Sequence, residues 1–313
     1  MWRANLGPLV SAVTDQEGYL VLALDDPRYV DLAANLALSI RRVETRPVSV
    51  VIHEGQDFPA RYKTLFDQVI AIAPSQDYRG AMNKVRMDGC SPYGRTMYVD
   101  ADCLLINNRI EFFWVKYRGK HFAVEGHRQS AGPAFACSLG SKDAAELCRL
   151  LEVSALTVFN AGVIYFENSA RARAVFERSR DLYLGPLRDQ LTYQYKHAGE
   201  YADEPIFGAA LAQLGIAPFE PPLTHRLQVT TPNIVGGTVD LDTGELTLIK
   251  HAPGGREQAW SGAICHFCGL SPMDTYFDLA DRLRREAGLP PMARDNFRPV
   301  VLTATHHHET VTS

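Results

Sequence analysis

The sequence predicts an α/β fold in which a mostly parallel central sheet is flanked by helices, with an added β-hairpin and a C-terminal helix. Two observations carry this prediction. Continuous apolar runs alternate with helical repeats through the first hundred residues. Aspartates then follow two of these runs directly, as expected where strands end at a ligand site. A length of 313 residues also suits two domains, but no Pro- or Gly-rich linker divides the chain.

The first β–α–β unit is the clearest part of the pattern. A strand is expected at Tyr19–Leu24, because an uninterrupted apolar run suits a strand that is buried on both faces. Apolar residues then recur at helical spacing from Tyr29 to Arg42, and Asp25 or Asp26 can cap that helix. A second strand is expected at Val48–Ile52. This order predicts parallel strands joined by a right-handed crossover.

The remaining elements follow from the same signals. The first half continues with helical patches at Ala60–Phe66 and Ala81–Met87 and strands at Val69–Ile72 and Arg95–Val99. In the second half, strands are expected at His121–Val124, Val158–Phe166 and Ala263–Phe267, and helices at Lys142–Leu151, Arg171–Tyr183, Asp203–Leu214 and Met273–Ala287. A hairpin is expected at Thr238–Lys250, where alternating residues surround Asp242-Thr243-Gly244.

Composition excludes several classes of protein. Lys and Arg total 32 and Asp and Glu total 36, so the formal net charge of −4 argues against a nucleic-acid partner. No stretch reaches about 18 consecutive apolar residues, so no transmembrane segment is expected. The first residues lack a basic start followed by an apolar core, and the six scattered cysteines are interpreted as reduced thiols. We therefore expect a cytoplasmic protein.

The strongest candidate for chemistry is the pair Asp100 and Asp102, directly after an expected strand. Two carboxylates so close together repel each other, and a divalent cation relieves the repulsion. Mg²⁺ and Mn²⁺ favour such oxygen ligands and complete their shell with substrate phosphates. The alternative is a solvated turn in which the aspartates cap backbone amides.

Two later segments add polar groups to apolar strands. Asn160-Ala161-Gly162 interrupts an apolar run, which indicates either close approach to a ligand or a β-bulge. His266 lies near the end of an expected strand, between Cys265 and Cys268. A zinc or redox role for these cysteines is an alternative, but no second cysteine pair completes a closed zinc site.

The ordered combination of these segments resembles the GT-A-fold glycosyltransferases, which have a Rossmann-like sheet. It is most similar to the family 8 group that includes glycogenin and lipooligosaccharide galactosyltransferases. The resemblance rests on the first strand with the segment after it, Lys84, Asp100-Ala101-Asp102, Phe159–Val163 and His266–Gly269. These pieces extend from about residue 19 to 270.

The resemblance implies a role for each matching position. Asp100, Asp102 and His266 would bind Mn²⁺ (or Mg²⁺), which holds the diphosphate of a nucleotide sugar. The donor itself, expected to be a UDP-sugar, would contact Ala23, Leu24, Asp25, Tyr29, Lys84, Asp100, Ala101 and Asp102. Asn160 would contact the donor sugar. Asp203 would lie near its anomeric carbon, with Glu204 in place of the glutamine that is common there.

The resemblance is incomplete in one respect. The family often has a lysine that clamps the diphosphate shortly after the histidine segment, whereas Gly269 is followed here by Leu-Ser-Pro-Met-Asp. The group that replaces this lysine is not evident from the sequence.

The function expected from the sequence is a metal-dependent hexosyltransferase-type enzyme that acts on an unknown acceptor, with retention as one outcome. Two alternatives are a nucleotidyltransferase of similar fold and a non-catalytic nucleotide-sugar-binding protein. Because the expected metal ligands come from both halves of the chain, residues 1–298 are expected to form a single catalytic domain. Its nucleotide-binding half would be 1–106 and its sugar and acceptor half 107–298. Residues 299–313 are expected to be a disordered tail, and a homodimer is left open.

Overall fold

The computed structural model describes residues 14–137, 140–194, 200–251 and 255–297. Its N-terminal part contains β1 (Thr14–Leu22), α1 (Arg28–Val43), β2 (Val48–His53), η1 (Ala60–Leu65), β3 (Gln68–Ile72), η2 (Gly80–Gly89) and β4 (Tyr93–Val99). The strands β1–β4 pair in parallel, as the β–α–β pattern predicts. They form most of a six-stranded central sheet with the order β3-β2-β1-β4-β11-β6.

The other half of the chain completes this sheet with antiparallel strands. It begins with β5 (Cys103–Leu105), α2 (Ile110–Tyr117), β6 (Phe122–Ala123), β7 (Gly126–Gln129), β8 (Pro133–Cys137), β9 (Gly140–Asp143) and α3 (Ala144–Leu151). It continues with β10 (Leu156–Phe159), β11 (Val163–Glu167), α4 (Ala170–Leu184), α5 (Arg188–Leu191) and α6 (Glu204–Gln213). Strand β11 pairs antiparallel with both β4 and β6, so the sheet is mixed, with a parallel core.

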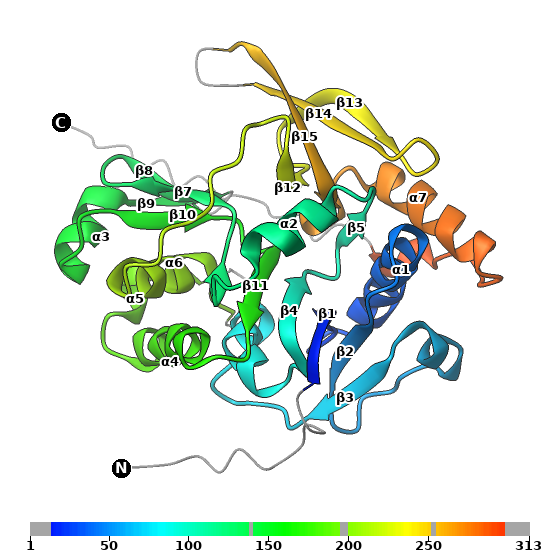
Figure 1. Ribbon diagram of the computed structural model, residues 1–313, viewed down its shortest axis with the longest axis horizontal. Helices are drawn as coiled ribbons and strands as arrows, with labels where there is room; N and C mark the ends of the chain where they lie inside the picture. Colours follow the sequence, from blue (N-terminus) through cyan, green and yellow to red (C-terminus); the bar gives the residue numbers. More distant parts are fainter. Residues whose placement is uncertain (1–13, 138–139, 195–199, 252–254, 298–313) are drawn as a thin grey trace, which may run out of the picture.

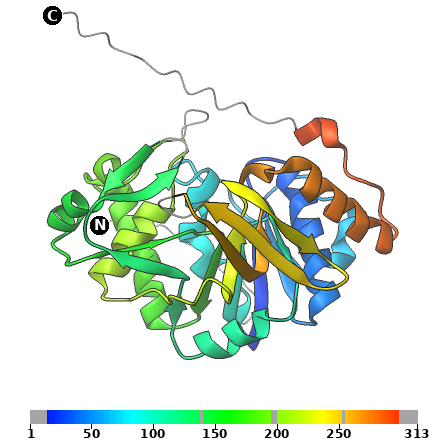
Figure 2. The same cartoon turned by 90° about the horizontal axis from the view of Figure 1, so that it is seen from above.

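A second sheet is built from the C-terminal segments. Its strands are β12 (Arg226–Thr230), β13 (Ile234–Asp240), β14 (Glu245–His251) and β15 (Glu257–His266), and β5 joins it by pairing with β15. The chain then forms η3 (Cys268–Leu270), α7 (Met273–Glu286) and η4 (Arg294–Phe297). Figure 2 shows this sheet lying between the helices α1 and α7 on one side and α4 and α6 on the other. The pairing of β5 with β15 brings the segment after Asp102 beside His266.

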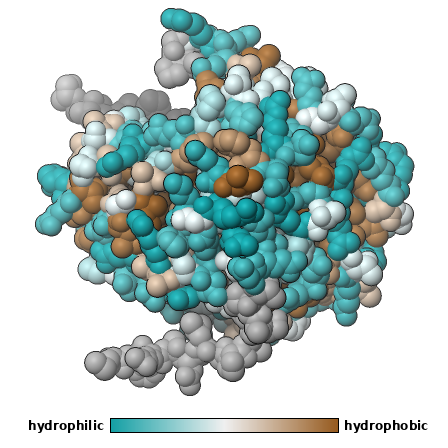
Figure 3. All heavy atoms as spheres, viewed as in Figure 1, coloured by the Kyte–Doolittle hydropathy of each residue, from teal (hydrophilic) through white to brown (hydrophobic). Residues whose placement is uncertain are grey.

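Apolar side chains are buried on both faces of the central sheet. One core cluster lies under α1, α2 and α7, and the other lies under η2, α3, α4 and α6. Figure 1 shows α1 and α7 on one side of the sheet and α4, α5 and α6 on the other. Because both faces of the central strands are buried, their sequences are continuous apolar runs. On the face in Figure 3, hydrophilic side chains dominate and hydrophobic ones are interspersed among them.

The α/β architecture predicted from the sequence is confirmed, but the single strand expected at Val158–Phe166 is wrong. The chain forms β10 in a small sheet with β7, breaks at residues 160–162, and then enters the central sheet as β11. The Asn160 side chain accepts a hydrogen bond from the Gly162 backbone N–H at 3.1 Å, which stabilises the turn between the two strands. The helical patches Ala60–Phe66 and Ala81–Met87 are 3₁₀ helices rather than α-helices.

The remaining expectations concern the hairpin, a membrane-spanning segment, the C-terminal tail and the organisation of the chain. The hairpin expected at Thr238–Lys250 is present as β13 and β14, paired antiparallel with Asp240 opposite Glu245. None of the described helices is both long and apolar enough to cross a membrane. The tail expected to be disordered, residues 299–313, lies outside the described residues. The cytoplasmic location, the single-domain organisation and the homodimer remain predictions.

Candidate active site

The candidate site is a cleft of about 670 Å³ at the carboxyl ends of β1 and β4. Its walls come from the ends of these strands, the start of α1, η2 and Gly269. Carboxyl ends of neighbouring strands open at the same edge of a sheet, which is why residues far apart in sequence meet here. The cleft is lined by seven of the residues singled out from the sequence, which are Leu24, Asp25, Tyr29, Lys84, Asp100, Ala101 and Asp102.

Lys84 is the buried centre of one part of the site. Its Nζ lies 3.0 Å from Asp100 and 3.0 Å from Asp203, and it donates a hydrogen bond to the backbone oxygen of Ala161 at 3.1 Å. Burial alone would lower the pKa of Lys84, but the two carboxylates hold it well above its ordinary value. Lys84 is therefore charged at neutral pH and ties together η2, the end of β4 and the start of α6.

The two carboxyl groups at the start of α6 have different surroundings. Burial raises the pKa of Asp203, an effect that Lys84 opposes and Asp100 increases. Burial raises the pKa of Glu204, and the nearby negative charge of Asp203 raises it further, to about 7. The Oε1 atom of Glu204 accepts hydrogen bonds from Asn160 Nδ2 at 2.8 Å and from the Ala161 backbone N–H at 3.2 Å. Glu204 is thus a partly buried carboxyl that can gain or lose a proton near neutral pH.

Asn160 connects Glu204 to His266 and determines how the imidazole is oriented. Asn160 Oδ1 lies 2.8 Å from His266 Nδ1 and also accepts the Gly162 N–H, so this oxygen acts as an acceptor. Nδ1 of His266 must then carry the hydrogen. In the neutral imidazole this leaves the lone pair on Nε2, which faces Asp102 at 3.2 Å. The arrangement is typical of a metal-binding histidine whose second nitrogen is held by a hydrogen bond.

The residues around His266 fit a divalent metal ion. His266 Nε2 lies 3.2 Å from Asp102 and 3.9 Å from Asp100, so both aspartates face the same ring nitrogen. Burial alone would lower the pKa of His266, but Asp102 raises it well above its ordinary value. In turn, the pKa of Asp102 is lowered, because the charge of His266 outweighs the effect of burial. A metal ion here would take over the position of the imidazolium proton.

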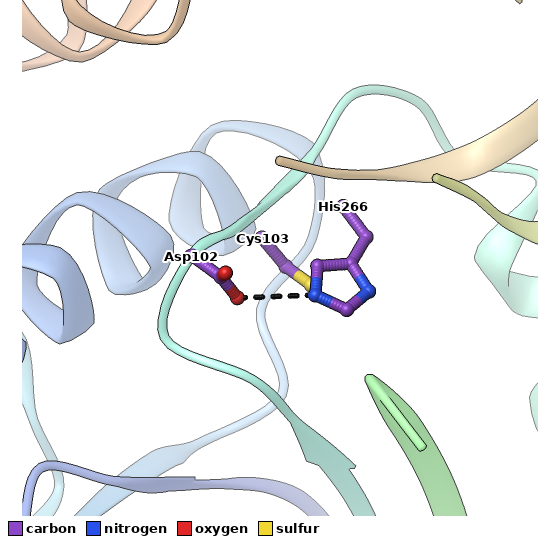
Figure 4. Close-up of side chains that lie close together, drawn as sticks. All are labelled: Asp102, Cys103 and His266. Atoms are coloured by element: carbon purple, nitrogen blue, oxygen red, sulfur yellow. Dashed lines mark ion pairs between the residues drawn. The ribbon is translucent and has the colours of Figure 1, made fainter. Parts of the chain in front are cut away.

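The closest set of ligand atoms differs in one member from the expected set. Among the described residues, one carboxylate oxygen of Asp102, the sulfur of Cys103 and one nitrogen of His266 lie within 4.8 Å of one another (Figure 4). Asp100 is not a member of this group, although its carboxylate lies 3.9 Å from His266 Nε2. That carboxylate binds Lys84 and accepts a hydrogen bond from Tyr98. As a metal ligand, Asp100 would have to share its oxygens with these two groups.

Gly162 is required for the position of His266. A Cβ atom added at this residue would lie 2.3 Å from His266 Nδ1 and 2.7 Å from Gln228 Oε1. We expect Gly162→Ala to displace the imidazole, to weaken Mn²⁺ binding at least ~10-fold and to cost about 1–3 kcal/mol of unfolding free energy. Calorimetric titration with Mn²⁺ and thermal unfolding would measure both effects.

Gly89→Ala is the matched control for this substitution, because no atom lies within 4 Å of its added Cβ. It should leave Mn²⁺ binding unchanged. Equal Mn²⁺ affinity in Gly162→Ala and the unmodified protein would show that His266 does not depend on the glycine, or does not bind the metal.

The opposite wall of the cleft is organised by Asp25. This residue has a left-handed backbone conformation with φ of 65°. Its carboxylate accepts hydrogen bonds from the Gly80 backbone N–H and from Asn83 Nδ2, both at 2.7 Å, and lies 2.8 Å from His53 Nε2. These contacts join the end of β1 to η2 and leave the exposed ring of Tyr29 at the cleft.

The structure separates one expected donor-binding residue from the others. Ala23 is fully buried and does not line the cleft. Its backbone N–H donates to Val51 at 2.8 Å, and its carbonyl accepts a hydrogen bond from Gln56 Nε2 at 2.9 Å. By contrast, Asn160, Asp203, Glu204 and His266 all join the hydrogen-bonded network around Lys84 and Asp102.

Several residues of the site were not singled out from the sequence. Tyr98 donates a hydrogen bond to Asp100, and its position was available from strand periodicity, because residues two apart share a face. Asn83 binds Asp25, and Gln228 donates from Nε2 to the backbone oxygen of Asn160 at 2.8 Å. Cys103 was interpreted only as one of six reduced thiols. The sequence carried no signal for Gln228, since its role depends on where β12 lies.

Comparisons with known proteins identify the fold. No family model matches the sequence, and no curated protein matches it. A solved structure of the galactosyltransferase LgtC, in complex with donor and acceptor sugar analogs, matches with a TM-score of 0.51 and 14% identity. That match covers 88% of this chain and 98% of LgtC.

Two further solved structures are similar over part of their length. The WbbM bifunctional glycosyltransferase matches with a TM-score of 0.50 and 13% identity, over 87% of this chain and 50% of that one, so the chain spans about half the length of WbbM. Mouse xyloside xylosyltransferase 1 is more distant, with a TM-score of 0.39 and 15% identity over 80% of this chain and 97% of that one. At such low identity the likeness to LgtC and WbbM shows the fold alone, and it confirms the GT-A-type fold expected from the sequence.

Proposed function

We propose that the protein is a metal-dependent glycosyltransferase that transfers a sugar from a nucleotide-sugar donor, a UDP-sugar, to an acceptor of unknown identity. One observation carries this proposal. Four chain segments that are distant in sequence contribute Asp102, Asn160, Asp203 and His266 to one network of ion pairs and hydrogen bonds. Asp102 and Lys84 of this network also line the cleft at the carboxyl ends of the parallel strands. The likeness in fold to LgtC, a galactosyltransferase by name, supports the same class of reaction.

The diphosphate end of the donor would lie against Asp100, Asp102 and His266, which would hold Mn²⁺ or Mg²⁺ between them. When bound, the ion acts as a Lewis acid on the phosphate oxygens. His266 offers Nε2 because its Nδ1 is held by Asn160. Two carboxylates and one imidazole are a suitable donor set for Mn²⁺, with open positions left for phosphate oxygens.

Lys84 supplies a fixed positive charge beside this site. Its ammonium group is already oriented by Asp100, Asp203 and the Ala161 carbonyl, so it needs little reorganisation during the reaction. Glycosyl transfer develops negative charge on the departing nucleoside diphosphate. A preorganised cation within the cleft would stabilise this charge in the transition state.

The sugar end of the donor would lie toward the start of α6. Asn160 can hydrogen-bond a sugar hydroxyl, and the negative charge of Asp203 can stabilise the cationic character that develops at the anomeric carbon. Glu204, with its pKa raised to about 7, can exchange a proton near neutral pH. We propose retention of configuration on the family resemblance, with the departing phosphate receiving the acceptor's proton.

The first test of this function is ligand-induced stabilisation. UDP with Mn²⁺ should raise the melting temperature, because a ligand at about 100 times its Kd adds about 2.7 kcal/mol to the unfolding free energy. EDTA should reverse the rise, and an adenine or guanine nucleoside diphosphate with Mn²⁺ should produce a smaller one. The absence of any UDP-dependent rise would exclude the proposed donor.

A panel of UDP-sugars incubated with the protein and Mn²⁺ then tests catalysis. Slow release of UDP from one donor is expected, with water as the acceptor. UDP-dependent stabilisation without hydrolysis or transfer of any donor would instead support the non-catalytic nucleotide-sugar-binding alternative.

A further inference from the structure

We infer that Cys103 makes this metal site able to bind Zn²⁺ through a thiolate, with Asp102, Cys103 and His266 as the three protein ligands. The proposal deepens the proposed function, on which its consequence for catalysis rests. Zinc binding itself can be tested without any assumption about the reaction.

The placement of Cys103 follows from the pairing of β5 with β15. Cys103 lies directly opposite His266 in this antiparallel pair, so the two side chains point to the same face of the sheet. Asp102 precedes Cys103 in the chain and turns back toward the imidazole, with an oxygen 3.2 Å from Nε2. Figure 4 shows the carboxylate, the sulfur and the ring together, and their ligand atoms lie within 4.8 Å of one another.

The site is also shielded and held in position. Cys103 is fully buried and His266 is 5% exposed. Asp102 Oδ2 accepts a hydrogen bond from the Gly269 backbone N–H at 3.3 Å, and Asn160 holds the second nitrogen of His266 at 2.8 Å. Such supporting contacts orient the ligands before a metal ion arrives.

The three donors form a different chemical set from the pair of aspartates with His266. One thiolate, one imidazole and one carboxylate suit Zn²⁺, whereas Mn²⁺ and Mg²⁺ gain little from sulfur. On binding, the S–H bond of Cys103 breaks, its proton leaves to solvent, and a Zn–S bond forms. Three protein ligands leave a fourth tetrahedral position open to water or a phosphate oxygen.

A consequence for the proposed enzyme is competition between two kinds of ion. Zn²⁺ would use Asp102 and His266, which are also the expected ligands of Mn²⁺. Zn²⁺ binds a given nitrogen, oxygen and sulfur site more tightly than Mn²⁺ does. We therefore expect submicromolar free Zn²⁺ to displace Mn²⁺ from the full-length protein.

Co²⁺ is the probe for the thiolate ligand. Adding Co²⁺ to the metal-free, reduced full chain should produce a sulfur-to-cobalt charge-transfer band in the near ultraviolet, and Zn²⁺ should abolish the band by competition. Cys103→Ser and Cys103→Val should both lose the band and weaken Zn²⁺ binding at least ~10-fold. Cys148→Ala, on α3, is the control that should keep the band. Cys268→Ser tests the other thiol at the site, whose side chain hydrogen-bonds His266, and it should also keep the band.

The outcomes separate this inference from the proposed function. Absence of the band in the unmodified protein, or a band lost in Cys268→Ser but kept in both Cys103 variants, overturns the role of Cys103. Circular dichroism of each variant shows whether the band is lost because the protein is unfolded. If Cys103→Ser disturbs the packing of the core, the apolar variant Cys103→Val provides the test. If UDP and Mn²⁺ stabilise a protein that gives no cobalt band, the inference fails alone. If the protein gives the cobalt band but UDP with Mn²⁺ does not stabilise it, the inference about Cys103 holds and the proposed UDP-sugar donor is excluded.

Discussion

Replacing Lys84 by Met should lower the unfolding free energy by about 3–5 kcal/mol, because the substitution leaves two partly or fully buried carboxylates without their shared counterion. The pKa of Lys84 is raised above its unfolded value, so its stabilising contribution is fully present at neutral pH. That contribution is lost only as the pH rises through the folded-state pKa. Denaturant unfolding at pH 7 would measure the loss.

A second substitution separates the effect of charge from the effect of shape. Asp203→Asn added to Lys84→Met removes one of the two unpaired carboxylates, so the double variant should recover part of the lost stability. Lys63→Met, at an exposed lysine of η1, should change stability by less than about 0.5 kcal/mol. A loss below about 1 kcal/mol in Lys84→Met would contradict a buried ion network at this site.

The other large effect is expected from Asp102→Asn. The amide keeps the shape of the side chain and can still accept the Gly269 N–H, so the variant should remain folded, although it loses the ion pair with His266. A neutral amide is a much poorer metal ligand than a carboxylate, and we expect Mn²⁺-dependent release of UDP to fall at least about 100-fold. Steady-state assays over a range of Mn²⁺ concentrations would measure the fall.

The matched control is Asp274→Asn, whose side chain is 96% exposed on α7. It should retain both activity and Mn²⁺ affinity. Wild-type turnover in Asp102→Asn would remove the aspartate pair from the mechanism. If a high concentration of Mn²⁺ restores the activity of Asp102→Asn, the role of Asp102 is limited to metal affinity.

Much of the fold could be predicted from local patterns. Strands that are buried on both faces must be apolar throughout, so β1, β2 and β4 were recognisable from composition alone, and their order with α1 predicted parallel pairing. The strand expected through residues 158–166 was wrong because apolar composition does not show to which sheet a segment belongs. β10 and β11 are both apolar, yet they pair with different partners on either side of Asn160.

The candidate site could be predicted where the type of a residue indicates its chemistry, as for carboxylate and imidazole side chains that bind metal ions. Asp100, Asp102 and His266 were proposed from motifs, and the structure brings them together. The contacts of Asn160 with both Glu204 and His266 could not be predicted, because they join segments that are 44 and 106 positions apart. Sequence spacing contains no information on such distances once the chain reverses between them.

By itself, the sequence determined the class of fold, the strand ends where polar residues gather and the kinds of ligand that those residues can bind. These properties depend on the side chains and on their periodicity within one segment. Only the tertiary structure decided that Lys84 neutralises Asp100 and Asp203, that Ala23 lies in the core, and that Cys103 faces His266. The physical reason is that charge pairing and metal binding act over a few ångströms between segments, and folding alone sets those distances.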